Sequence, residues 1–204
     1  MERLVTQAKE MAEEGVKELI LVAQETTVYG TDIYGKKSLH ILLKELCKIK
    51  GIRWIRVLYC YPEEIYDELI QTMKEEKKIC HYLDLPIQHA SDRILKRMGR
   101  RTTQAELVEI VNKLRREIPD IVLRTTLISG FPGETQEDHE ELMGFVDEME
   151  FDRLGVFTYS PEEDTPAATM PDQVAEEVKE ARRDEIMELQ QEISFEKAED
   201  MVGK

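Results

Sequence analysis

Residues 121–135 read Ile-Val-Leu-Arg-Thr-Thr-Leu-Ile-Ser-Gly-Phe-Pro-Gly-Glu-Thr and predict a strand, a tight loop and a helix in direct succession. The first nine are mostly β-branched or apolar, which is typical of a strand. Gly130 and Gly133 form a loop in which the backbone can turn sharply and approach another molecule closely. Thr135 and Asp138 have the spacing of a capping pair at the start of a helix.

The same alternation of strand and helix extends along the chain. Strands are expected at residues 18–23, 54–59, 81–88, 121–129 and 154–159, with helices between them and a long charged helix from 172 to about 200. Such alternation predicts an α/β fold with a mostly parallel sheet or a barrel. Because a strand usually precedes each helix of a parallel unit, we expect a first strand, and the loop after it, upstream of the opening helix.

Composition narrows the class of protein. The chain has 204 residues, and 28 Lys+Arg against 43 Asp+Glu give a net charge of −15. This charge repels phosphates, so nucleic-acid binding by this segment is not expected; solubility and a basic partner both explain the charge. No apolar run of 18 residues and no secretory signal occur, so no membrane span is expected. Cys47, Cys60 and Cys80 lack metal or disulfide spacing and fit a reducing cytoplasm.

Polar residues and glycines follow most of the predicted strands. Ligands of parallel α/β folds bind at the carboxyl ends of the strands, which share one rim. The candidate residues there are Gln24, Glu25 and Thr27 after the first strand, Gln88, His89 and Ser91 after the third, Gly130, Gly133 and Glu134 after the fourth, and Tyr159 after the fifth. The rim is therefore the expected functional site.

Each candidate has a functional and a structural explanation. The 130–134 loop leads into a helix whose free N–H groups suit a carboxylate or a polar adenosine edge, but a capped turn explains it too. Glu25 could hold an ammonium group or be solvated. Arg124, inside an apolar strand, needs either an anionic ligand or an ion pair within the sheet. His89 could be catalytic or shape its loop, and the histidines lack the spacing of metal ligands.

Four segments together resemble the radical S-adenosylmethionine methylthiotransferase family. They are residues 22–30, 84–92, 130–135 and 157–165, which follow the family's order across nearly the whole chain. Gln24-Glu25-Thr26-Thr27 and Gln88-His89-Ala90-Ser91 resemble the branch that modifies a small-subunit ribosomal protein more closely than the transfer-RNA branch.

The resemblance implies a reaction and a fold. The full-length enzyme would add a methylthio group to the β-carbon of an aspartate in that ribosomal protein, using S-adenosylmethionine and [4Fe-4S] clusters. Residues 1–171 would form a partial (βα)6 radical-SAM barrel without its first strand and cluster loop, and residues 172–204 a long helix leading to an absent C-terminal β-domain. The family's Cys-x-x-x-Cys-x-x-Cys loop is missing, so no cluster ligand is assigned to this chain and the isolated fragment is expected to be inactive.

The resemblance also implies roles for the rim residues. Glu25 and Thr27, beside Gln24, would lie near the methionine ammonium of S-adenosylmethionine and Arg124 near its carboxylate; Gly130, Gly133 and Glu134 would form a ledge for ribose and methionine; Tyr159 would lie near adenine; and Gln88, His89 and Ser91 would line the central cavity. No residue is assigned to catalysis.

Three other functions remain open: a transfer-RNA adenosine methylthiotransferase, a fragment that binds S-adenosylmethionine without catalysis, and an ordinary barrel lyase or hydrolase. The last would need a lysine, a metal triad or a carboxylate pair at the rim, and none has helpful spacing. A cytoplasmic monomer with a basic ribosomal protein as its substrate is expected, and no segment indicates the electron donor or the sulfur source.

Overall fold

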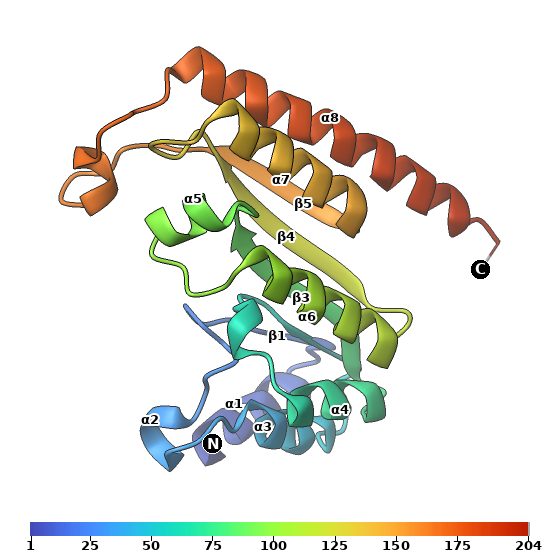
Figure 1. Ribbon diagram of the computed structural model, residues 1–204. Coiled ribbons are helices and arrows are strands. Elements are labelled where there is room, and N and C mark those ends of the chain that lie inside the picture. The colour runs from blue at the N-terminus through green and yellow to red at the C-terminus, as the bar shows by residue number, and fades with distance from the viewer. Residues whose placement is uncertain (204) are drawn as a thin grey trace. The chain divides into compact units, whose positions relative to one another are not determined.

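The computed structural model describes residues 1–203 and contains all five predicted strands (Figure 1). The strands are β1 (Glu18–Leu21), β2 (Trp54–Val57), β3 (Ile79–Gln88), β4 (Val122–Ser129) and β5 (Arg153–Thr158). The helices are α1 (Glu2–Glu13), α2 (Thr31–Tyr34), α3 (Leu39–Cys47), α4 (Asp67–Glu75), α5 (Asp92–Arg97), α6 (Gln104–Glu117), α7 (Gln136–Met149) and α8 (Glu176–Asp200), with the 3-10 turns η1 (Pro62–Glu64) and η2 (Pro166–Thr169).

The strands belong to one sheet in the order β1-β2-β3-β4-β5. β1 is parallel to β2, β2 to β3, and β4 to β5. Parallel neighbours need a crossover connection, which the helices between successive strands provide. The predicted α/β fold with a parallel sheet is confirmed.

The chain divides into two compact units, and the first comprises residues 1–85 and 112–122. Its central helix is α3, which packs against α1, α4 and β2. The buried face of α3 consists of Leu39, Leu42, Leu43, Leu46 and Cys47. This spacing places the five side chains on one side of a helix, so the apolar pattern of the sequence determines which face is buried.

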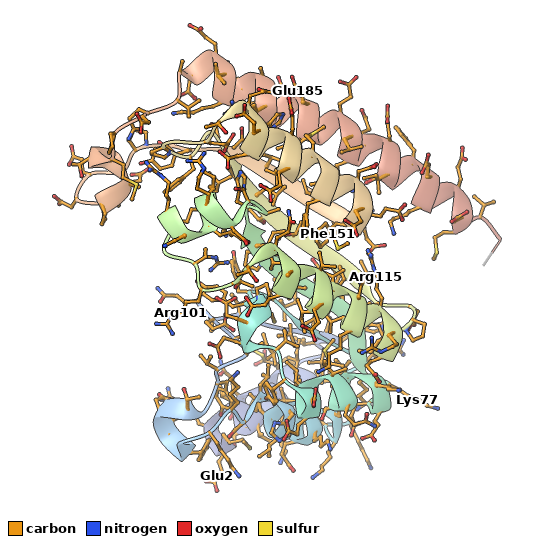
Figure 2. All side chains as sticks on the ribbon, in the orientation of Figure 1. Glu2, Lys77, Arg101, Arg115, Phe151 and Glu185 are labelled. Atoms are coloured by element: carbon orange, nitrogen blue, oxygen red, sulfur yellow. The ribbon has the colours of Figure 1, made fainter. Side chains whose placement is uncertain are left out.

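The second unit comprises residues 86–111 and 123–204. In this unit α8 lies along α7 and β5 (Figure 1). The predicted inward residues of α7, Leu142, Phe145, Val146 and Met149, are all buried. Phe151 (Figure 2), just beyond α7, is fully buried and packs near Phe145. Its carbonyl accepts a 2.8 Å hydrogen bond from Gln190 Nε2 of α8.

Helix α8 differs from the prediction at its start and in its buried face. It begins at Glu176 rather than at residue 172, because Asp172 has a φ of +63°, which a right-handed helix cannot include. Its buried residues are Lys179, Arg182, Ile186, Gln190 and Ile193, three of which are polar. Nowhere in residues 1–203 is a helix both long enough and apolar enough to cross a membrane.

Two helix starts carry reciprocal caps, and the one at Thr135 and Asp138 confirms the prediction. The Thr135 amide donates to Asp138 Oδ2 at 2.8 Å, and the Asp138 amide donates to Thr135 Oγ1 at 3.3 Å. Thr103 and Glu106 exchange the same two bonds at 2.8 and 3.3 Å. These bonds satisfy backbone donors that the first turn of a helix leaves without partners.

Candidate functional site

In the first unit, Glu25 organises the loop that follows β1. Its Oε1 accepts hydrogen bonds from the amide of Thr27, at 2.8 Å, and from the Thr27 hydroxyl. Its Oε2 accepts the Tyr61 amide at 2.8 Å. A carboxylate offers about four acceptor positions, so about one remains for a further donor such as an ammonium group. Thr27 is fully buried and its hydroxyl is engaged with Glu25, while Gln24 beside them is exposed.

The surroundings of Glu25 disfavour its negative charge. Burial raises the pKa of Glu25, the amides of Thr27 and Tyr61 oppose this effect, and the nearby carboxylates of Glu64 and Glu63 add to it. The net pKa lies above the ordinary value. A cationic ligand would offset the unfavourable free energy of ionising Glu25. The surroundings of Glu25 therefore favour a positively charged group.

In the second unit, Glu134 folds back into the loop that precedes it. Its Oε2 accepts the amides of Gly130 at 2.8 Å and Phe131 at 3.3 Å. The Gly133 amide donates to the Asp172 carbonyl at 2.7 Å. With Glu134 and Thr135 also bonded, every N–H from residue 130 to 135 has a partner. Within the loop, the protein itself therefore supplies the acceptors for these N–H groups.

Two further side chains contact the Glu134 carboxylate. Arg182 Nη1 of α8 donates to Oε1 at 2.9 Å, and both side chains are buried. His89 is fully buried, and its Nδ1 accepts the Ser91 amide at 2.9 Å, which leaves a ring proton on Nε2. This Nε2 lies 3.5 Å from Glu134 Oε2 and has no hydrogen-bond partner among residues 1–203, so the contact is electrostatic.

The pKa of Glu134 follows from these contacts. Burial raises it, but His89, the Gly130 amide and Arg182 together outweigh burial and hold the pKa below the ordinary value. Glu134 is therefore an ionised, buried carboxylate that fixes the 130–134 loop. Its atoms face the protein's own donors.

A second group of side chains, Ser91, Arg93 and Arg97, holds the same loop from the side of α5. The Ser91 hydroxyl donates to Asp138 Oδ1 at 2.7 Å, and Arg93 also binds Asp138. Arg93 Nη2 donates to the Gly133 carbonyl at 2.7 Å, and Arg97 Nε donates to the Pro132 carbonyl at 2.9 Å. The outward-facing carbonyls of the loop are thus held by α5, and Ser91 acts through Asp138.

Both loop glycines are required by close contacts. Gly130 and Gly133 have φ values of +72° and +83°, which side chains disfavour. A Cβ atom at Gly130 would lie 2.2 Å from Lys179 Cγ of α8, and one at Gly133 would lie 2.8 Å from the Arg97 guanidinium carbon. The expected close approach is made by neighbouring side chains of this chain.

Tyr159 lies in a small apolar cluster. Its ring packs edge-to-face against Phe131 with 5.2 Å between centroids, and Ile94 joins them. The Lys179 ammonium lies 5.4 Å from the Tyr159 ring and donates to the Tyr159 carbonyl at 2.9 Å. The buried Tyr159 hydroxyl has no hydrogen-bond partner within residues 1–203, so this end of the ring is available to a polar group.

Gln88 and Arg124 are placed differently from the other candidates. Gln88, the last residue of β3, is half-buried and has a φ of +71°, an uncommon conformation for glutamine. Arg124 is the third residue of β4, at its amino end. It precedes Ser129 by about 17 Å at 3.3 Å per residue, so β4 does not bring Arg124 to the rim with Gly130.

Sequence reasoning missed Lys179, Arg182, Arg93 and Arg97. Lys179 and Arg182 lie on a helix whose charge suggested a solvated surface, and both are nearly buried. The available signal was the spacing, three residues from Lys179 to Arg182 and four from Arg182 to Ile186, which places all three on one face.

The three cysteines do not fit an iron–sulfur cluster. Burial raises the pKa of Cys47 to about 11 and raises those of Cys60 and Cys80 above their ordinary value. Cys47, Cys60 and Cys80 also lack the Cys-x-x-x-Cys-x-x-Cys spacing, and cluster ligands are cysteines held close together. Among residues 1–203, no three His, Cys, Asp or Glu side chains are grouped to hold a metal ion.

A parallel sheet covered by helices defines an α/β domain, a class of fold that binds ligands at the carboxyl ends of its strands. The model of the Radical SAM superfamily matches residues 1–146, and the chain belongs to that superfamily.

Individual relatives give a finer comparison. The chain is 69% identical over 204 residues to the ribosomal protein uS12 methylthiotransferase RimO of Lachnoclostridium phytofermentans, covering 100% of this chain and 46% of the relative. It is 60% identical to the RimO of Clostridium perfringens, with the same coverage. The chain thus spans about half the length of the curated relatives it matches.

Solved structures support the fold. Coproporphyrinogen III oxidase from Escherichia coli, a radical SAM enzyme, matches 94% of this chain and 46% of its own with a TM-score of 0.66 at 17% identity. SuiB of Streptococcus suis matches 92% of this chain and 40% of its own with a TM-score of 0.57 at 19% identity. At such low identity the likeness concerns the fold.

The contacts of Asp138 generate a pH-dependent stability prediction. Burial raises the pKa of Asp138, but hydrogen bonds from Thr135, Arg93 and Ser91 lower it to about 2, from 3.8. We expect Asp138→Asn to lose about 2 kcal/mol of unfolding free energy at pH 7. Because the pKa of Asp138 is lower in the folded state, the difference in unfolding free energy between the two proteins should be fully present above about pH 4. It should shrink as the pH falls toward 2.

Urea denaturation of both proteins from pH 7 to pH 2.5 measures this difference. Asp147→Asn is the matched control, because Asp147 is an exposed aspartate on the same helix. A difference that stays constant over the whole pH range would show that the Asp138 charge does not stabilise the fold.

The buried pair Glu134–Arg182 generates a second prediction. Glu134→Gln and Arg182→Met should each cost about 3–5 kcal/mol, because each leaves a buried charge without its partner. The double variant should cost clearly less than the sum of the two single variants. Arg183→Met, at a partly exposed neighbour that pairs with Asp184, should change stability by less than about 0.5 kcal/mol. Strict additivity in chemical denaturation would contradict the pairing.

Proposed function

We propose that this chain is part of a radical S-adenosylmethionine methylthiotransferase that adds a methylthio group to the β-carbon of an aspartate in ribosomal protein uS12. The observation that carries the proposal is the 69% identity, across all 204 residues, to a relative with that printed name. The match of the Radical SAM superfamily to residues 1–146 supports the reaction class.

We propose that S-adenosylmethionine binds at the carboxyl ends of the strands. When bound, it supplies the methyl group and the means of activating a C–H bond. The Glu25 carboxylate fits its ammonium group, because about one acceptor position is free and the surroundings of Glu25 disfavour uncompensated negative charge. Thr27 orients Glu25, and Gln24 lies exposed beside them.

In the second unit the 130–134 loop would act as a rigid ledge for the ribose and methionine parts. Glu134 and Asp138 hold its shape through hydrogen bonds, and Lys179 and Arg97 pack closely against Gly130 and Gly133. Tyr159 would lie near adenine, with its unpartnered hydroxyl as a polar contact. Gln88, His89 and Ser91 would border the cavity, His89 and Ser91 acting from behind the loop. Arg124, placed at the amino end of β4, has the weakest support as a carboxylate ligand.

We further propose that the ligands of the [4Fe-4S] clusters lie outside these 204 residues. The spacing of Cys47, Cys60 and Cys80 supports this, because it contains no Cys-x-x-x-Cys-x-x-Cys motif. We also propose that residues 1–171 form the core of the radical SAM domain, which the superfamily match to residues 1–146 supports, and that helix α8, within the segment 172–204, leads out of it. A ribosomal-protein substrate would place the reaction in the cytoplasm.

The cluster proposal has a direct test. The 204-residue chain, reconstituted anaerobically with iron and sulfide and then gel-filtered, should retain well under one iron per chain. A protein of the relatives' full length that contains this chain, called the full-length protein below, should retain iron under the same treatment and serves as the control. Stoichiometric iron and visible absorption in the 204-residue chain would refute the proposal.

The proposed reaction is tested by mass spectrometry. The reconstituted full-length protein should increase the mass of uS12 by about 46 Da, the exchange of hydrogen for methylthio, and should leave transfer RNA unchanged. Because the chain carries a net charge of −15 and ribosomal proteins are generally basic, the rate at sub-saturating uS12 should fall as salt rises.

Two controls keep this experiment specific. Glu25→Gln should raise the KM for S-adenosylmethionine, whereas Asp147→Asn should not. A mass gain on transfer RNA and none on uS12 would assign the chain to the other branch of the family.

A further inference from the structure

The backbone at Tyr59, two residues beyond β2, is strained. Its φ of +56° lies in the left-handed region, where bulky residues are rare and cost free energy. Among residues 1–203, the other non-glycine residues with positive φ are Gln88, Glu150, Asp164 and Asp172, so Tyr59 is the aromatic member of this group. Glycine would adopt the same conformation without strain, which indicates that the tyrosine side chain is needed.

Hydrogen bonds on both sides fix this conformation. The Tyr59 amide donates to Asp84 Oδ2 at 3.3 Å, and the Tyr59 carbonyl accepts the Thr26 amide at 3.0 Å. Thr26 Oγ1 also donates to the Leu58 carbonyl at 2.6 Å, and the Cys60 amide donates to the Asp84 carbonyl at 2.9 Å. Strain persists where the surroundings over-determine it, and such positions cluster at functional sites.

The strain reverses which side chains are exposed. Side chains alternate between the faces of a strand, so after buried Val57 and half-buried Leu58 the next inward residue would be Tyr59. Instead Tyr59 is 47% exposed and Cys60 is 0% exposed. The left-handed conformation of Tyr59 therefore exposes its aromatic ring to solvent and buries the thiol of Cys60.

The Tyr59 backbone is bonded to the loop that contains Glu25, because its carbonyl accepts the amide of Thr26, the neighbour of Glu25, at 3.0 Å. The next residue but one, Tyr61, donates its amide to Glu25, and the pKa of Glu25 is raised first by burial and further by Glu64 and Glu63. Lys37 pairs with Glu64 at 2.8 Å and offsets part of this charge. No hydrogen bond or ring contact engages the Tyr59 side chain within residues 1–203. Aromatic faces attract cations, so ring and carboxylate favour the same kind of ligand.

We propose that Tyr59 is a specificity residue for the sulfonium cation of S-adenosylmethionine, with its ring against the positive sulfur while Glu25 accepts from the ammonium group. The inference deepens the proposed function and rests on it. Tyr59 thereby distinguishes S-adenosylmethionine from S-adenosylhomocysteine, which keeps the ammonium group but has a neutral sulfur.

Calorimetry of the full-length protein with its clusters, under anaerobic conditions, tests the proposal with both ligands. Tyr59→Asn removes the ring and keeps a residue that tolerates the left-handed conformation. It should weaken S-adenosylmethionine binding about fivefold and change S-adenosylhomocysteine binding less than about twofold. Tyr59→Phe, which keeps the ring, should bind both ligands as the parent does.

Melting temperatures separate this role from a structural one. Because Asn relieves strain, Tyr59→Asn should melt at or above the temperature of the parent. Equal weakening for the two ligands, unchanged affinity for both, or a large loss of melting temperature would overturn the proposal for Tyr59 alone. Failure of the parent protein to bind S-adenosylmethionine would overturn the proposed function together with this inference.

Discussion

The loops at the strand ends depend on carboxylates that accept backbone amides. Among residues 1–203, the buried carboxylates are Asp84, Glu134 and Asp138. Each accepts at least one loop amide, from Tyr59, Gly130 and Thr135 respectively. A loop that is neither strand nor helix leaves its N–H groups without regular partners, and a charged acceptor binds them strongly. Half-buried Glu25 does the same for Thr27 and Tyr61.

This constraint changes how the glycine loop can recognise a ligand. A loop before a helix normally attracts anions through free N–H groups. Here residues 130–135 use those groups internally, and Arg93 and Arg97 occupy the carbonyls of Gly133 and Pro132. The loop therefore contributes shape rather than donors. In the proposed function, polar recognition therefore rests on side chains. In the first unit, Glu25 retains an acceptor position and Tyr59 an exposed ring; in the second, the Tyr159 hydroxyl has no partner within residues 1–203.

The sequence predicted what local patterns determine. Apolar runs located the five strands, the Thr135–Asp138 spacing located a cap, and the face of α7 followed from its periodicity. The start of α8 was misplaced, because the left-handed conformation of Asp172 depends on its loop. The conformation of Tyr59 was equally hidden, since hydrogen bonds from Thr26 and to Asp84 impose it against its own preference. Long-range polar contacts have no signature in a single sequence.

Helix α8 shows why charge alone misleads about burial. The chain has an excess of acidic residues, yet Lys179 and Arg182 are buried on this helix. Arg182 neutralises Glu134, and the Lys179 stem covers Gly130 while its ammonium binds the Tyr159 carbonyl. Burying Arg182 or Glu134 without its partner would strongly destabilise the fold. The stability of α8 and that of the glycine loop are therefore coupled. The long helix is therefore part of the machinery that shapes the second unit's rim, and any movement of α8 must act on the loop.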